Sequence, residues 1–154
     1  MKKIKIICIS LCCLLLFCSC GSGQSTSTTV LDFTTLPDGE MDISNLSLEH
    51  GELLSVIHNG DIVVVKAKIT SSYSNKATID QNYYNISKLI KENGFNTCKE
   101  LQYWAIADMA NAEEAKCISF TLDEDTISAI FDGNIVENQI GDYATDLWIL
   151  PSLK

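Results

Sequence analysis

The clearest pattern of the chain is a pair of alternating apolar and polar runs in ELLSVIHNGDIVVVKAKIT. This alternation predicts two strands, and Asn59-Gly60 between them suits a two-residue type I′ turn, whose positions both need positive φ. Setting His58 opposite Asp61 pairs Ile57 with Ile62. We expect one face of this hairpin to be core, formed by Leu54, Val56, Val63, Val65, Ala67 and Ile69. The other face becomes polar toward one end, which indicates a sheet covered on one side.

Helical periodicity follows in TIDQNYYNISKLIKENGF and predicts a long helix over about residues 79–93. Thr78 and Gln81 match a capping box at its start, and Gly94 suits the left-handed position just past its end. One stripe of the helix is apolar, and its members are Ile79, Tyr83, Ile86, Leu89 and Ile90. We therefore expect this helix to pack on the core face of the sheet.

A second hairpin is predicted in KELQYWAIADMANAEEAKCISFTL, with its turn near residues 111–114. If Ala110 pairs with Ala115, Tyr103 faces Leu122, and small alanines on that face leave room for the helix. Trp104 then lies on the opposite face. This register is open, because a slip of one residue moves every side chain to the other face.

The last third of the chain predicts a short helix and a final strand. Asp123 suits the N-cap of a helix over about residues 124–132, although Asp132-Gly133 also allows a hairpin turn there. The run DLWIL reads as a strand that Pro151 stops. Residues 30–48 hold no period and predict an irregular lead-in with one short edge strand.

These elements follow one another in the order β-β-α-β-β-α-β. They predict an α+β layer fold with an antiparallel or mixed sheet of about five strands. The long helix packs on one face of this sheet, and the whole of residues 30–154 forms a single domain.

The N-terminus has the pattern of an export signal. Lys2, Lys3 and Lys5 precede an apolar stretch from Ile6 to Cys18 that is interrupted only by Ser10. As a helix this stretch would span about 20 Å, less than the roughly 30 Å of a bilayer core, so a permanent transmembrane helix is not expected.

Ser19-Cys20 at the end of this stretch resembles the processing site of bacterial lipoproteins. In that class a small residue precedes a cysteine that is acylated on its thiol and becomes the new N-terminus. The resemblance implies that residues 1–19 are removed, that Cys20 carries the lipid, and that residues 20–29 are a Gly/Ser/Thr spacer. The domain would then be anchored at the extracytoplasmic face of the cell membrane. An ordinary secretory signal is the alternative, and residues 30–154 resemble no family that we recognise.

Removing the signal makes the remaining chain strongly acidic. It keeps eight lysines against 20 acidic residues, a formal charge of −12, and the chain contains no arginine. Binding to nucleic acid, or a second, polybasic contact with the membrane, would require clustered Lys and Arg, so neither is expected. The acidity instead suits solubility at a surface, or a cationic partner.

Only two cysteines remain after processing, Cys98 and Cys117. The hairpin register sets Cys117 opposite Asp108 and leaves Cys98 about 30 Å away along the strand. A disulfide needs Cα atoms within about 7 Å, so we expect two buried thiols and no disulfide.

Residues with recognisable chemistry are few. His58 flanks a turn, where a solvated side chain is expected. A catalytic Cys–His pair is therefore not expected. The acidic run at residues 123–125 lacks the later ligands of a calcium loop, because Ile127 stands at the third ligand position; a weak surface Ca²⁺ site is the alternative. Motifs for nucleophilic serine, phosphate-binding or zinc sites are absent, and we expect no catalytic residue, metal or cofactor.

The feature that bears most on function is a set of apolar side chains on one face of the predicted sheet. The sheet face away from the long helix carries Trp104, Ile106, Ile57 and Ile62. These residues form a partner surface if nothing covers them. DLWIL or the lead-in could provide such a cover. The sequence thus predicts a non-catalytic, lipid-anchored module that binds a protein or envelope partner. The alternative is a small cell-surface hydrolase that acts through carboxylates.

Overall fold

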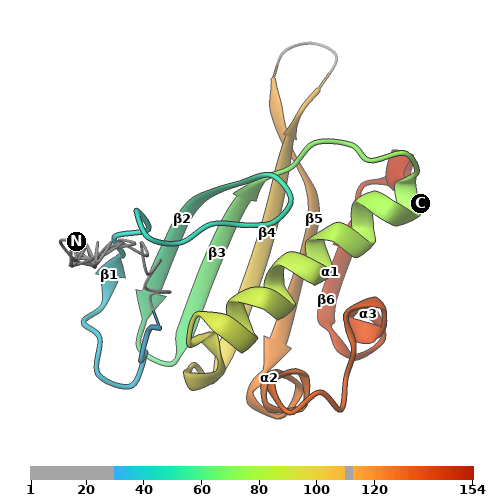
Figure 1. Ribbon diagram of the computed structural model, residues 1–154. Helices are drawn as coiled ribbons and strands as arrows, with labels where there is room; N and C mark the ends of the chain where they lie inside the picture. Colours follow the sequence, from blue (N-terminus) through green and yellow to red (C-terminus); the bar gives the residue numbers. More distant parts are fainter. Residues whose placement is uncertain (1–29, 110–112) are drawn as a thin grey trace, which may run out of the picture.

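One mixed sheet organises the fold, and each strand lies beside the strand that follows it in the sequence (Figure 1). The computed structural model describes residues 30–109 and 113–154. Its strands are β1 (Gly39–Glu40), β2 (Glu52–Asn59), β3 (Ile62–Lys68), β4 (Glu100–Asp108), β5 (Glu114–Asp123) and β6 (Thr145–Ile149). Only β3 and β4 pair in parallel, and helix α1 (Asn75–Glu92) connects them, as parallel neighbours require a crossover.

The α-helices of the described residues lie on one side of the sheet (Figure 1). These are α1, α2 (Glu124–Phe131) and α3 (Ile140–Tyr143), and single-turn 3₁₀ helices occupy Phe95–Thr97, Glu137–Gln139 and Pro151–Leu153. The core lies between α1 and the sheet, and its largest fully buried side chains include Tyr103, Phe95, Phe120, Ile86, Leu89 and Ile90. The predicted α+β class is confirmed, and the sheet has six strands where about five were expected. The predicted order of elements also differs in detail, because β1 precedes the first hairpin and α3 is added between α2 and β6.

Helix α1 starts earlier than predicted, at Asn75. The Ser74 side chain caps it by accepting a hydrogen bond from the backbone amide of Ala77 at 3.1 Å. Thr78 is therefore not the N-cap, and its hydroxyl instead accepts a bond from the amide of Ser72 at 2.9 Å. The predicted end is right, because Gly94 follows the helix with a positive φ of 85°.

The first hairpin has the predicted faces with a different register. Asn59 pairs with Ile62, so the turn is Gly60-Asp61, and Ile57 faces Val64 in place of Ile62. The displacement amounts to two residues in the pairing, which keeps every side chain on its expected face. Asp38 supports this turn by accepting a hydrogen bond from the amide of Gly60 at 2.7 Å.

Two details of β2 contradict the sequence prediction. An irregularity between Leu53 and Ser55 makes Leu54 an extra residue, so Leu53 is buried in its place. His58 is buried and only 4% exposed, because the lead-in covers it and the carbonyl of Pro37 accepts a bond from its Nδ1 at 3.1 Å.

The second hairpin is also displaced by two residues. Tyr103 faces Phe120 where Leu122 was expected, and Tyr103 still points into the core. Past Ala105 a bulge interrupts the pairing at Cys117, which is buried there and not opposite Asp108. The predicted partner Ala110 and the tip of the turn lie outside the described residues.

The C-terminal predictions hold. Asp123 caps α2 by accepting a bond from the amide of Thr126 at 2.9 Å, which excludes the alternative hairpin. The run DLWIL contributes β6, which pairs with β5 as an edge strand. Within residues 30–109 and 113–154, no helix combines the length and apolarity needed to cross a membrane.

Candidate functional site

The side of the sheet opposite α1 carries the predicted partner surface, and we call it the open face. Paired residues on neighbouring strands point to the same side of a sheet, so the strand register maps this face in rows. The central row crosses five strands and consists of Ser55, Lys66, Trp104, Ser119 and Trp148. A neighbouring row contains Ile57, Val64, Gln102 and Thr121.

Two tryptophans and one lysine form the centre of the open face. The Nζ atom of Lys116 lies 4.8 Å from the ring centroid of Trp148 and 5.9 Å from that of Trp104. Both rings are accessible, with Trp104 46% and Trp148 38% exposed. We call these three residues the Trp–Lys cluster; its contacts are cation–π interactions at a solvated surface.

The four predicted patch residues have different surroundings. Ile57 is 42% exposed and Ile62 is half-buried, while Trp104 belongs to the Trp–Lys cluster. Ile106 is only 7% exposed and adds little accessible surface. It lies in register between two lysines, Lys68 and Lys116, whose long aliphatic stems can cover an apolar side chain.

Neither segment considered as a cover lies over the open face. The lead-in packs on the helix side, where Phe33 and Leu46 join the buried cluster. β6 extends the sheet at its edge and adds Trp148 to the open face. The sequence prediction missed Trp148, although its place within DLWIL could have indicated it: Ile149 packs against the core, so the preceding residue points to the other side.

Two of the three lysines that the structure describes on the open face, Lys66 and Lys116, are unpaired, while the third, Lys68, binds Asp108 and Glu114. Five lysines form ion pairs with carboxylates, and they are Lys68, Lys76, Lys88, Lys91 and Lys99. Among the described residues, Lys66, Lys116 and the C-terminal Lys154 form none. An acidic domain therefore presents two unpaired ammonium groups beside its exposed tryptophans.

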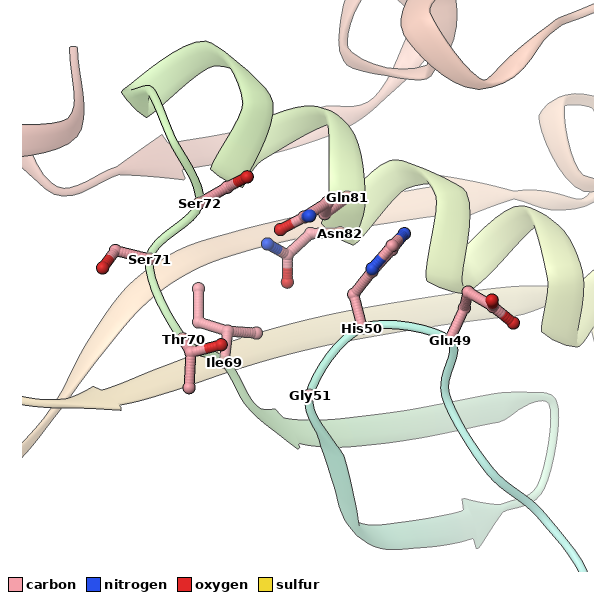
Figure 2. Close-up of a pocket in the computed structure, with 9 residues that line it drawn as sticks. All are labelled: Glu49, His50, Gly51, Ile69, Thr70, Ser71, Ser72, Gln81 and Asn82. Carbon is pink, nitrogen blue, oxygen red and sulfur yellow. The ribbon is translucent and has the colours of Figure 1, made fainter.

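A polar pocket lies on the helix side, between α1 and the loops that flank β2 and β3 (Figure 2). Its volume is about 310 Å³. The loop after β3 contributes Thr70, Ser71 and Ser72, α1 contributes Gln81 and Asn82, and the loop before β2 contributes Glu49, His50 and Gly51. Hydroxyl and amide groups thus dominate its wall.

Buried polar side chains of α1 hold both loops of this pocket. Asn85 accepts a hydrogen bond from the backbone amide of His50 at 2.9 Å and donates one to its carbonyl at 2.6 Å. Thr78, about two helical turns before Asn85, accepts a hydrogen bond from the amide of Ser72 at 2.9 Å. At Gly51, φ is 91° and an added Cβ would lie 2.3 Å from the carbonyl oxygen of Lys68, so a larger residue would displace the loop.

The histidine and cysteine that come nearest to a catalytic pair line a different cavity. His58 and Cys98 both border a space of about 420 Å³ beneath the lead-in. Burial raises the pKa of the Cys98 thiol to about 12, so the nucleophilic thiolate is disfavoured. The buried Nε2 atom of His58 has no hydrogen-bond partner among the described residues.

The carboxylates near the polar pocket do not have the environment of a general acid, whose pKa must be raised. A hydrogen bond from Lys88 lowers the pKa of Glu49, and one from Lys91 lowers the pKa of Glu137. In the part of the chain that the structure describes, no three His, Cys, Asp or Glu side chains gather as a metal site.

Comparison of the chain with protein-family models, with curated proteins and with solved structures finds no match.

Proposed function

We propose that this protein is a lipid-anchored, non-catalytic binding module that holds an acidic protein partner at the cell envelope through its open face. The observation that carries the proposal is the exposed Trp–Lys cluster at the centre of a sheet face that no helix of the described residues covers. Tryptophan dominates the binding energy of many interfaces because it buries a large area. Solvation of the domain alone does not require two tryptophans there.

The unpaired lysines favour a partner with acidic groups. Lys66 and Lys116 can each bind a carboxylate without giving up an ion pair inside the domain. Lysines elsewhere, such as Lys88 with Glu49 at 2.8 Å, would first have to release a carboxylate. Charge complementarity of this kind contributes mainly specificity and association rate, while the rings contribute contact area.

The anchor and spacer of the proposal come from the sequence. Lipidation at Cys20 would hold the mature chain at the extracytoplasmic face of the cell membrane, and stable anchoring requires at least two acyl chains. A flexible spacer of residues 20–29 would have a root-mean-square length of roughly 16–19 Å, which lets the open face turn toward a neighbouring protein.

The test is site-specific photocrosslinking of the full-length protein in its native membrane. Benzoylphenylalanine at position 57 reports on the open face, and the same group at position 131 is the matched control on α2. Ile57 and Phe131 are similarly exposed apolar residues on opposite sides of the sheet. We expect a stoichiometric adduct from position 57 only, and its loss with Trp104→Ala or Lys116→Glu.

Equal adducts from both positions, or none from position 57, would contradict a partner site on the open face. The anchor is tested separately with Cys20→Ser. That variant should leave the membrane fraction, and in detergent it should still give the position-57 adduct. Retention of the variant in the membrane would contradict lipidation at Cys20.

A further inference from the structure

A second depression lies along α1 beside the polar pocket. The second depression also measures about 310 Å³, and His50 and Gln81 line both. Tyr73 and Tyr84 border the second part. We call the two together the helix groove; it lies on the other side of the sheet from the open face.

Each carboxylate of the helix groove already has a lysine partner. Glu49 binds Lys88 at 2.8 Å, and Glu137 binds Lys91 at 2.9 Å. The third carboxylate, Asp80, binds Lys76 at 2.6 Å within α1. The groove therefore offers neither a free carboxylate for a cationic ligand nor a free ammonium group for an anionic one.

Four neutral side chains of the groove, in contrast, are unused. Within the described residues, the side chains of Thr70, Ser71, Ser72 and Gln81 form no hydrogen bond. Three hydroxyls and one amide can each donate and accept. Figure 2 shows Thr70 and Ser72 on the β3–α1 loop and Gln81 on α1, while the Ser71 side chain points away from α1. A ligand that offers several neutral donors and acceptors at short spacing matches this wall.

Aromatic rings border the same groove. The rings of His50 and Tyr84 lie 5.6 Å apart at a tilt of 60°, and Tyr73 is almost fully exposed. Such rings offer flat apolar faces beside the polar wall. The C–H face of a pyranose ring stacks on surfaces of this kind while its hydroxyl groups bind amides and hydroxyls.

From these contacts we propose that the helix groove binds a neutral sugar residue of a glycan. Its polar wall is fixed before binding, because the buried side chains of Asn85 and Thr78 hold His50 and Ser72 through hydrogen bonds. Fixed walls reduce the ordering cost of binding. The lysine-neutralised carboxylates select against charged sugars, and the hydroxyl and amide wall selects against apolar ligands.

The test is a titration of the full-length protein in detergent, followed by backbone and side-chain amide NMR shifts. The neutral probes are maltotriose, cellotriose and triacetylchitotriose; the charged probes are the trimers of galacturonate and glucosamine. We expect a neutral probe to shift the amides of residues 70–73 and the side-chain amide of Gln81, with charged probes binding more weakly.

Gln81→Ala removes one hydrogen-bonding group and should lower the affinity for the neutral probe about three- to tenfold. The matched control is Asn134→Ala, which truncates an exposed amide outside the groove and should leave the affinity unchanged. Photocrosslinking from position 57 should be unaffected in both variants, so the two proposals fail independently.

Three results would overturn the sugar site. They are the absence of shifts with every neutral trimer, equal affinity of Gln81→Ala and the unmodified protein, and shifts that map to the open face in place of the groove.

Discussion

On the helix side of the sheet, apolar side chains of α1, α2 and the strands are buried together, and the lysines of α1 are paired with carboxylates. On the open face, two tryptophans remain exposed, and Lys66 and Lys116 pair with no carboxylate of the described residues. The same strands form both faces, because successive side chains of a strand alternate between them. The difference therefore arises from what packs on each face.

The need for a stable fold explains the buried apolar side chains of the helix side, but it does not explain the exposed rings of the open face. Burial of side chains such as Ile86 and Phe120 supplies its driving force, whereas the exposed rings of the open face gain little from folding. A face that combines large exposed aromatic rings with unpaired charge is typical of a surface that becomes buried on binding.

The first prediction compares one isoleucine from each face. Ile86→Ala should lower the free energy of unfolding by roughly 3 to 4 kcal/mol, because Ile86 is fully buried against the sheet. Ile57→Ala should cost less than about 1 kcal/mol, because Ile57 is exposed on the open face. Urea unfolding followed by circular dichroism measures both. Equal losses would show that the open face is packed like a second core.

The second prediction concerns the contact between the lead-in and the end of α1. At Gly94 an added Cβ would lie 1.8 Å from the carbonyl oxygen of Leu31, and φ is positive. Gly94→Ala should therefore cost about 3 kcal/mol of unfolding free energy. The matched control is Gly133→Ala, which has positive φ and open space around it, and should cost about 1 kcal/mol. A similar cost for both would contradict close packing of the lead-in.

The third prediction addresses the polar part of the helix side. The Tyr103 hydroxyl donates to Oδ1 of Asn82 at 2.8 Å, and burial raises the pKa of Tyr103, which keeps this donor protonated. Tyr103→Phe leaves the buried oxygen of Asn82 without this donor and should cost about 1 to 3 kcal/mol in urea unfolding. The exposed control Tyr84→Phe should cost less than about 0.5 kcal/mol. Unchanged stability of Tyr103→Phe would argue against this buried contact.

The smallest effect is expected at the N-cap of α2. Asp123→Ala should cost about 1 kcal/mol at neutral pH. Hydrogen bonds from the Thr126 side chain and amide hold the pKa of Asp123 below its ordinary value of 3.8. A lowered folded-state pKa stabilises the protein above that ordinary value, and the gain is lost as pH falls through the folded-state pKa. The difference in unfolding free energy between the unmodified protein and Asp123→Ala should thus shrink below about pH 4. A difference that stays constant with pH would show that the ionised carboxylate is not the cap.

Much of the fold follows from local patterns of the sequence. Alternation places Tyr103 and Val65 on the correct faces. Both hairpins differ from the predicted register, but a displacement of two residues keeps each side chain on the same face. Helical periodicity likewise places Ile86 on the buried side of α1. The end of α1 is equally local, since Gly94 supplies the left-handed conformation that terminates the helix.

The remaining differences depend on contacts between distant segments. His58 is buried because the lead-in, some twenty residues earlier, covers it. Ser74 replaces Thr78 as the cap because Thr78 binds the loop that carries Ser72. Sequence patterns located Trp104 of the open face, but the helix groove depends on loops that meet only in the folded chain.

The most direct test of the two-face account combines stability and binding in one variant. Trp104→Ala/Trp148→Ala removes both rings of the Trp–Lys cluster. We predict that it loses no more than about 2 kcal/mol of unfolding free energy while the photocrosslink from position 57 disappears. A loss comparable to that of Ile86→Ala, or an undiminished adduct, would contradict the assignment of the open face to binding.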